Sequence, residues 1–333
     1  MGEFELIERY FKRATYPSHV ALGVGDDCAL LQPAPGMQLA ISSDMLVEGR
    51  HFLPDVDPQA LGHKALAVNL SDLAACGARP LAFTLALALP QAHAPWLAGF
   101  AQGLLDLAEA HGCALIGGDT TQGPLNICIT IFGEVPAPGG ATQALQRSGA
   151  QAGDALYVSG QPGQARLALD ALLGQRPLPA AVLAALRPRL ERPTPRVALG
   201  LALRGVASAA MDVSDGLQGD LRHILKASGV GATLDVDAAV TLLGSNTANA
   251  VTDWLPTLPR EAQLRCVLAG GDDYELLFTA PPSRHAQVLA AAQASGTPVA
   301  CIGRIDREAG LRLVDAHGQA IRGDFPAFDH FAA

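Results

Sequence analysis

Strand-length apolar segments alternate with longer helical patterns along all 333 residues of this chain. Such alternation in both halves favours α/β layers, in which helices pack against sheets. Apolar residues make up 49% of the chain and charged residues only 17%, which excludes disorder for its bulk. At about 150 residues per domain, the length predicts two domains.

Apolar residues spaced three or four apart, with glycine or proline near the ends, mark the helical patterns. They predict helices over 59–77, 96–111, 167–173, 196–204, 215–228 and 284–294. Length and composition predict strands over 38–42, 81–89, 126–135, 155–159, 208–211, 232–236, 275–279 and 299–302.

A Pro/Gly-rich break, Pro136-Ala137-Pro138-Gly139-Gly140, follows one long predicted strand. The next strand begins only after Ala152-Gly153-Asp154. We therefore expect an N-terminal α/β domain at residues 1–138 and a C-terminal α/β domain at residues 150–333.

The formal net charge of −9 disfavours nucleic acid as a partner, because duplex binding needs a cationic surface. The N-terminus lacks the pattern of a secretory signal, and the longest apolar run, Leu81 to Leu89, is too short to span a bilayer. The six cysteines are not spaced as zinc ligands. We expect a cytoplasmic protein with reduced cysteines and no membrane partner.

Aspartates cluster beside glycine, serine or another aspartate, and we expect them at the ends of apolar strands. The clusters are Gly25-Asp26-Asp27, Ser42-Ser43-Asp44, Gly117-Gly118-Asp119-Thr120-Thr121, Met211-Asp212-Val213-Ser214-Asp215-Gly216 and Gly270-Gly271-Asp272-Asp273. Any one of them is also ordinary turn chemistry. Asp72 differs, because it lies in an apolar helical stretch where a carboxylate needs a hydrogen-bonded, cationic or metallic partner.

Taken together, the clusters favour a ligand site, since loops at strand ends are where α/β sheets bind ligands. Converging carboxylates repel one another unless cations intervene, and hard oxygen ligands suit Mg²⁺ together with substrate phosphates. The pattern predicts an acidic site that binds an anionic nucleotide through Mg²⁺. The sequence contains no P-loop and no G-x-S-x-G elbow, and the partial dinucleotide fingerprint at Gly23 has Cys28 at its third glycine position.

An ordered set of motifs identifies a family. In chain order they are Gly23-Val24-Gly25-Asp26-Asp27-Cys28-Ala29, the run from Ser42 to Phe52, the run from Lys64 to Ala75, Gly117-Gly118-Asp119-Thr120-Thr121, Met211-Asp212-Val213-Ser214-Asp215-Gly216-Leu217, Asp273-Tyr274-Glu275-Leu276 and Phe328-Asp329-His330-Phe331. Over nearly its whole length the chain resembles the bacterial thiamine-monophosphate kinases.

This resemblance implies ATP-dependent phosphorylation of thiamine monophosphate to thiamine diphosphate. It also implies a two-domain fold like that of aminoimidazole ribonucleotide synthetase, with the N-terminal domains paired across a homodimer and the nucleotide between the domains near the dimer interface. Several Mg²⁺ ions are implied. The number bound at once, and whether K⁺ is also needed, stay open.

The resemblance assigns roles to individual residues, none of them a general base. Mg²⁺ ligation falls to Asp27, Ser42, Ser43, Asp44, Asp72, Asp119, Asp212 and Asp215. ATP binding falls to Gly118, Asp119, Arg147 and Ser214, and substrate binding to His51, Asp272 and Phe328. From the sequence alone, each of His51, Arg147 and Phe328 could also be a surface residue without a binding role.

The chain departs from the family pattern at three of these positions. Ser43 replaces the commoner Thr, which keeps an oxygen ligand. Asp272 replaces the usual Glu and is one methylene shorter, so a direct substrate contact could become water-mediated. Phe328 replaces the usual Tyr or Trp, which keeps stacking but loses the polar group.

Two alternatives stay open. One is another ATP-using enzyme of the superfamily, such as aminoimidazole ribonucleotide synthetase itself, selenophosphate synthetase or a hydrogenase-maturation protein. The latter two would need a reactive cysteine near the N-terminus or at the C-terminus, whereas the first cysteine is Cys28 and the sequence ends His330-Phe331-Ala332-Ala333. The other is a non-catalytic Mg²⁺-nucleotide sensor, which would have lost some of the carboxylates.

Overall fold

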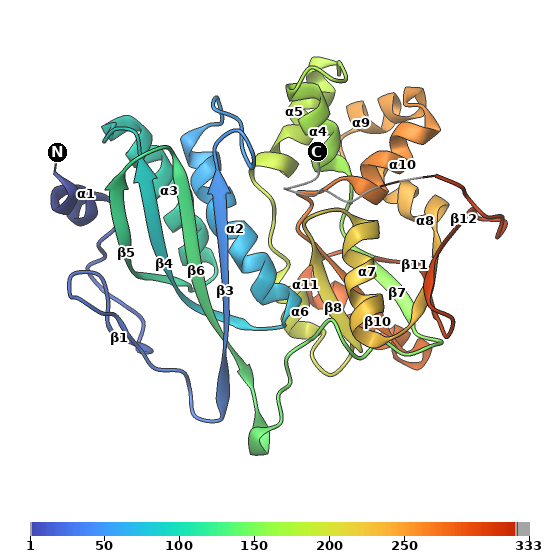
Figure 1. Cartoon of the computed structure of the whole chain (residues 1–333), viewed down its shortest axis with the longest axis horizontal. Helices are drawn as coiled ribbons and strands as arrows, with labels where there is room; N and C mark the ends of the chain where they lie inside the picture. The colour runs from blue at the N-terminus through green and yellow to red at the C-terminus, as the bar shows by residue number, and fades with distance from the viewer. Residues whose placement is uncertain (1, 324, 326–333) are drawn as a thin grey trace. The chain divides into compact units, whose positions relative to one another are not determined.

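The computed structural model describes residues 2–323 and 325 (Figure 1). The chain divides into two compact units. The N-terminal unit comprises Met1–Leu73 and Ala78–Ala144, and the C-terminal unit comprises Ala74–Gly77 and Leu145–Ala333.

The N-terminal unit is built on a four-stranded sheet in the order β3-β6-β4-β5. Strands β4 and β5 pair in parallel, and the other neighbours are antiparallel. The strands are β3 (Met37–Val47), β4 (Arg79–Leu89), β5 (Ala114–Gln122) and β6 (Asn126–Pro136). Outside this sheet lie α1 (Glu3–Tyr10), the pair β1 (Val20–Leu22) and β2 (Leu30–Leu31), and a 3₁₀ turn at Pro138–Gly140.

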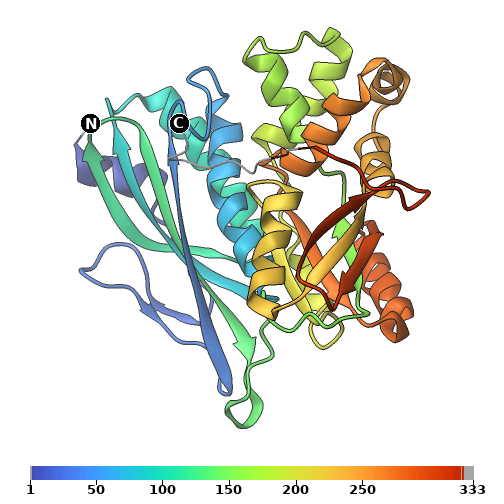
Figure 2. The ribbon, with the colours of Figure 1, turned by 45° about the vertical axis from the view of Figure 1, so that its right-hand side comes forward.

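Helices α2 (Pro58–Ala75) and α3 (Ala94–Ala110) lie along one face of this sheet (Figures 1 and 2). Helix α2 is apolar around much of its circumference, as expected of a buried helix. Its leucines Leu61, Leu66, Leu70 and Leu73 are at most 1% exposed. Glycines 62 and 103 permit a close approach of the two helices, because a Cβ at either would overlap a backbone oxygen of the other helix.

The C-terminal unit is built on a six-stranded sheet in the order β12-β9-β11-β7-β10-β8, in which only β9 and β12 pair in parallel. The strands are β7 (Ala155–Ser159), β8 (Ala209–Val213), β9 (Gly231–Asp235), β10 (Glu275–Ala280), β11 (Val299–Asp306) and β12 (Gly310–Val314). Strands β8 and β10 are buried along their full length, so both faces of the sheet are covered there.

The helices of the C-terminal unit are α4 (Gln164–Leu172), α5 (Ala180–Glu191), α6 (Val197–Ala202), α7 (Leu217–Ser228), α8 (Val236–Thr241), α9 (Asn249–Trp254), α10 (Arg260–Ala269) and α11 (His285–Ser295). Three 3₁₀ turns lie at Leu242–Gly244, Leu255–Thr257 and Pro282–Arg284. Among the described residues, no helix is both long enough and apolar enough to cross a membrane.

The position of β10 brings three loops to one end of this sheet. Strand β10 runs antiparallel to both β7 and β8, with Leu277 opposite Val158 and Glu275 opposite Val213. The residues that follow β7, those that follow β8 and those that precede β10 therefore share one edge.

The α/β layers predicted for both halves are confirmed. Each predicted helix and strand has a counterpart, and the largest shift is at the end of β3, expected at residue 42 and found at Val47. The placement of the aspartates at strand ends is wrong for two clusters, because residues 42–44 lie inside β3 and residues 117–119 inside β5. Pairing with neighbouring strands overrides the turn preference of Gly, Ser and Asp at these positions. The placement is confirmed for the cluster from Met211 to Gly216, since β8 ends at Val213 and Asp215 follows it.

Candidate functional site

Two of the aspartate motifs meet in a pocket of about 580 Å³ in the N-terminal unit. The loop between β1 and β2 contributes Gly25, Asp26 and Asp27, and β5 contributes the segment Gly117–Thr120. Apolar side chains such as Phe11 line the rest, and no Lys, Arg or His is among the described lining residues. The described lining therefore presents carboxylate oxygens and no cationic side chain.

Gly118 is fixed in this pocket by backbone geometry. Its φ is +143°, which disfavours any residue with a side chain. An added Cβ would also overlap the carbonyl oxygen of Leu85 on the neighbouring strand β4. Glycine here lets β5 run against β4 while Asp119, the next residue, stays exposed in the pocket.

A second group of predicted residues forms between β3 and α2. The Ser42 hydroxyl donates a hydrogen bond to a carboxylate oxygen of Asp72 on α2. The Asp44 backbone N–H donates to Asn69 Oδ1 at 3.2 Å, and the Asn69 amide is itself held by the carbonyl of Ala65. The sequence predicted that a carboxylate in this helix needs a partner, and the Ser42 hydroxyl is one such partner for Asp72.

Ser43 does not join that group through its hydroxyl. Successive residues of a strand point to opposite faces, so Ser43 faces away from Ser42 and Asp44. Its Oγ lies 3.0 Å from the Thr130 hydroxyl and 3.2 Å from the Ile129 carbonyl on β6. Only the backbone oxygen of Ser43 could share a ligand with its neighbours.

His51 is held in a turn just after β3. Its Nδ1 accepts the backbone N–H of Val47 at 2.9 Å, which puts the proton of a neutral imidazole on Nε2. Its carbonyl accepts a hydrogen bond from Lys64 Nζ at 3.1 Å. The ring orientation is thus set by the protein itself.

The donor chemistry of the N-terminal unit fits Mg²⁺. Within residues 2–323 and 325, no three Asp, Glu, His or Cys side chains come close enough to enclose an ion by themselves. Mg²⁺ usually keeps several waters and takes only one or two protein carboxylates plus substrate phosphates. Oxygen donors such as Asp27, Asp119 and the Ser42–Asp72 pair match that mode better than a closed cage.

In the C-terminal unit, two loops at the shared sheet edge are hydrogen-bonded to each other. The backbone N–H of Asp272 donates to the Ser214 carbonyl at 2.9 Å, and that of Tyr274 donates to the Val213 carbonyl at 2.8 Å. Asp272 and Tyr274 have φ values of +65° and +50°, and the Tyr274 hydroxyl donates to Asp272 Oδ1 at 3.2 Å. The predicted substrate residue Asp272 is thereby joined to the loop of the predicted nucleotide residue Ser214.

Asp220, in the first turn of α7, holds the other side of the Ser214 loop. Its Oδ2 accepts the backbone N–H groups of Ser214, Asp215 and Gly216 at 3.1, 3.2 and 3.1 Å. Burial raises the pKa of Asp220 to about 7, the Asp215 carboxylate acts in the same direction, and the three N–H groups oppose them. The expected helix start at residue 215 is wrong, because α7 begins at Leu217 once the loop has folded back.

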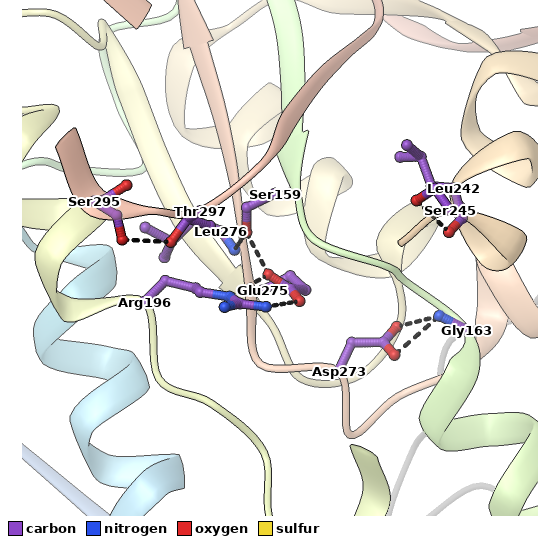
Figure 3. Close-up of polar contacts among 10 residues, drawn as sticks. All are labelled: Ser159, Gly163, Arg196, Leu242, Ser245, Asp273, Glu275, Leu276, Ser295 and Thr297. Carbon is purple, nitrogen blue, oxygen red and sulfur yellow. Dashed lines mark hydrogen bonds and ion pairs between the residues drawn. The ribbon is translucent and has the colours of Figure 1, made fainter. Parts of the chain in front are cut away.

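Asp273 and Glu275 anchor the loop that carries Asp272 (Figure 3). Both carboxylate oxygens of Asp273 accept the backbone N–H of Gly163, at 2.9 and 2.8 Å, at the start of α4. Burial raises the pKa of Asp273 well above its ordinary value, and nearby Glu275 and Asp272 add to the rise. Glu275 pairs with Arg196 and accepts the Ser159 hydroxyl at 2.5 Å.

Three predicted residues remain. Asp212 is 6% exposed within β8. Arg147 is exposed before β7, and among the described residues its guanidinium has no hydrogen bond or ion pair, although its carbonyl accepts the Ser228 hydroxyl at 3.2 Å. Phe328 lies outside the described residues.

The AIR synthase related protein domains match both halves, the N-terminal domain over residues 25–135 and the C-terminal domain over residues 151–316. The chain is 47% identical to the thiamine-monophosphate kinase of Salmonella typhimurium over 335 residues, which cover 99% of this chain and 98% of that protein. This chain belongs to the thiamine-monophosphate kinase family. The family predicted from the motifs is thus confirmed, and a second kinase of the family, from Escherichia coli, is 44% identical over 337 residues, 99% of this chain and 98% of that protein.

Solved structures of thiamine-monophosphate kinases share the fold. The enzyme from Stenotrophomonas maltophilia K279a is 44% identical, with a TM-score of 0.80 over 91% of this chain and 93% of that one. AaThiL, solved in complex with AMPPCP and TMP, is 28% identical, with a TM-score of 0.75 over 90% and 89%. Escherichia coli HypE, at 23% identity and a TM-score of 0.75 over 98% and 97%, is similar in fold alone.

The motifs did not assign roles to Asp220, Asp273, Glu275 and Arg196. Asp273 and Glu275 lie in a quoted motif, and only their contacts separate them from Asp272. Asp220 carries one sequence signal, an acidic residue in the first turn of a helix that follows Asp215-Gly216.

Proposed function

We propose that this member of the thiamine-monophosphate kinase family transfers the γ-phosphoryl group of ATP to thiamine monophosphate, which yields thiamine diphosphate and ADP. The observation that carries the proposal is the acidic pocket in which Asp27, Gly118 and Asp119 meet. The Salmonella and Escherichia kinases support it through identity over the full length. AaThiL supports it as a complex with AMPPCP and TMP.

The carboxylates are proposed to hold Mg²⁺. The candidates are Asp27, Ser42, Ser43, Asp44, Asp72 and Asp119 in the N-terminal unit, and Asp212 and Asp215 in the C-terminal unit. Ser43 would act through its backbone oxygen. When bound, Mg²⁺ would neutralise phosphate charge and orient the phosphoryl group for in-line transfer.

The acceptor needs no general base from the protein. The second pKa of a phosphate monoester is about 6, so thiamine monophosphate is largely dianionic at neutral pH and is a nucleophile as it stands. We therefore propose direct transfer without a phosphoenzyme. The task of the protein is placement, and we propose Gly118, Arg147 and Ser214 for the nucleotide and His51, Asp272 and Phe328 for the acceptor.

The N-terminal unit is proposed to pair with a second copy across the face of its sheet opposite α2 and α3. Helices α2 and α3 cover one face only, and β3 exposes Leu39, Ile41 and Met45 on the other, with 44, 60 and 52% of each residue exposed. A contiguous apolar face of this kind marks an interaction surface. A two-fold dimer would bury the same patch on both copies.

We propose that domains at 1–138 and 150–333 divide the work, the first supplying phosphate and metal binding and dimerisation, the second completing the nucleotide and acceptor site. We also propose a cytoplasmic location, which suits these substrates. K⁺ is a second candidate cation.

A coupled assay of ADP release tests the function. Purified protein with ATP and Mg²⁺ should release ADP only when thiamine monophosphate is added, and should form thiamine diphosphate in equal amount. Replacing K⁺ by Na⁺ in the same assay tests the K⁺ requirement. Activity with another acceptor but not with thiamine monophosphate would support a different enzyme of the superfamily, and protein-bound ³²P during turnover would contradict direct transfer.

A further inference from the structure

The loop that joins β8 to α7 has its backbone N–H groups turned into the protein. Three consecutive N–H groups, those of Ser214, Asp215 and Gly216, converge on one oxygen of Asp220. Asp220 is 2% exposed, so this carboxylate is a fixed internal acceptor. Three hydrogen bonds to one buried oxygen hold all three residues of the loop.

The carbonyl groups beside this loop are engaged as well. The Val213 carbonyl accepts the N–H of Tyr274, and the Ser214 carbonyl accepts that of Asp272. Gly271 packs so closely that an added Cβ would overlap the Ser214 oxygen. The loop is thus clamped from both sides, by α7 through Asp220 and by the segment that precedes β10.

This arrangement determines how the loop can meet an anionic ligand. A helix N-terminus commonly binds phosphate through free backbone N–H groups. Here the N–H groups of residues 214–216 already donate to Asp220, so they are not available in that way. The side chains of Ser214 and Asp215 are half-buried, so part of each is accessible to a ligand.

We propose that Asp220 is a positioning residue for nucleotide binding. It holds the loop with N–H groups inward, so that the Ser214 hydroxyl and the Asp215 carboxylate, rather than backbone N–H groups, engage a Mg²⁺-nucleotide. The identity of the ligand rests on the proposed function; the loop geometry does not. Asp220 itself touches no ligand in this scheme.

Two variants and one control test the proposal on the full chain. Asp220→Ala removes the acceptor, and Asp220→Asn keeps an oxygen of similar shape without the charge. Asp253→Asn, on the exposed side of α9, is the matched control for loss of one negative charge. Each is measured for Mg²⁺·AMPPCP affinity by calorimetry, for kcat and KM, and for amide hydrogen exchange over residues 213–217.

In Asp220→Ala we expect the amide hydrogens of residues 214–216 to exchange faster and the affinity for Mg²⁺·AMPPCP to fall at least about tenfold. We also expect kcat to fall on the order of 10²-fold, because misplacing a binding group has an effect of this size. Asp220→Asn should fall between Ala and wild type, and Asp253→Asn should match wild type.

Unchanged affinity in a folded Asp220→Ala protein, even with a lowered Tm, would overturn the proposal and leave Asp220 a purely structural residue. If Asp220→Ala does not fold, Asp220→Asn decides in the same way: unchanged affinity overturns the proposal and weaker affinity supports it. A wild-type protein that binds Mg²⁺·AMPPCP but does not phosphorylate thiamine monophosphate would refute the proposed function, while the affinities of the variants would still test Asp220.

Discussion

Arg196 and Glu275 form a bidentate ion pair inside the C-terminal unit. Arg196 Nε lies 2.7 Å from Glu275 Oε2, and Nη2 lies 2.5 Å from Oε1. The two side chains are 12% and 5% exposed. Glu275 begins β10, two residues after Asp273. The ion pair therefore fixes the start of the strand that follows the Asp272 loop (Figure 3).

Removing one partner of this pair should destabilise the protein strongly. Arg196→Met leaves a buried carboxylate with the Ser159 hydroxyl as its remaining neutral donor, and such a loss costs about 3–5 kcal/mol. Arg189 also interacts with Glu275, so we expect the lower end of that range. The control Arg265→Met removes the exposed ion pair with Glu261 and should lower the free energy of unfolding by less than about 1 kcal/mol. Urea unfolding measures the free energy of unfolding of both variants. Equally small losses in Arg196→Met and Arg265→Met would contradict a strong contribution from the buried pair.

Asp273 should make stability fall as pH rises. Its folded pKa is raised above the ordinary value, so between about pH 4 and that raised value unfolding releases a proton. Asp273→Asn keeps an acceptor for the Gly163 N–H but has no proton to lose. We expect the difference in Tm, variant minus wild type, to increase as the pH is raised from about 4. A Tm difference that stays constant across pH would show that Asp273 ionises normally.

Gly118 and Gly117 should respond differently to alanine. Gly118→Ala meets both an unfavourable φ of +143° and the Leu85 carbonyl, so we expect lost stability and weaker nucleotide binding. Gly117→Ala is its matched control, because a Cβ there would lie 3.8 Å from Thr84 Cγ2, an ordinary contact. Thermal unfolding and Mg²⁺·AMPPCP calorimetry compare the two. Similar behaviour of both variants would argue against a special role for residue 118.

Asp72→Asn should reduce activity while the fold persists. The amide oxygen still accepts the Ser42 hydroxyl, so the contact between β3 and α2 survives. Loss of the carboxylate charge should raise the Mg²⁺ concentration for half-maximal activity by at least about tenfold. Asp212→Asn should behave in the same way, whereas the exposed Asp106→Asn on α3 should not. Wild-type kcat and Mg²⁺ dependence in either variant would remove that residue from the proposed metal ligands.

Ile41→Lys should produce a monomer. Ile41 is 60% exposed on the sheet face opposite α2 and α3, and a buried unpaired charge on each copy would oppose pairing. Leu289→Lys on α11, at a residue 49% exposed in the other unit, is the control. Size-exclusion chromatography with light scattering distinguishes the states. A wild-type monomer, or an Ile41→Lys dimer, would refute pairing through this face.

The sequence was most informative where residues combine strong local preferences. The strand over 155–159 has the predicted bounds, because flanking turns and a mostly apolar composition agree there. Strand β5 was missed, since its Gly-Gly-Asp-Thr-Thr segment favours turns and becomes a strand only through pairing with β4. The pocket could not be foreseen for the same reason, because it requires β5 to lie beside the loop that holds Asp27.

Asp220 shows a second limit of sequence reasoning. A carboxylate in the first turn of an amphipathic helix is usually solvated, and nothing in the local pattern distinguishes one that is buried. Its burial depends on residues 214–216 folding back over the helix start. Motif spacing placed Ser214 and Asp215 together but could not indicate which group holds them.

The pairing of β3 with β6 has a consequence for synthesis of the protein. Strand β3 ends at Val47, and its partner is complete only at Pro136, which is 136 − 47 = 89 residues later. At ribosomal rates of about 5–20 residues per second, the nascent β3 waits roughly 4 to 18 s for its hydrogen-bond partner. Throughout that interval the backbone N–H and C=O groups of β3 that later pair with β6 have no strand partner, so β3 joins its sheet only after most of the N-terminal unit has been synthesised.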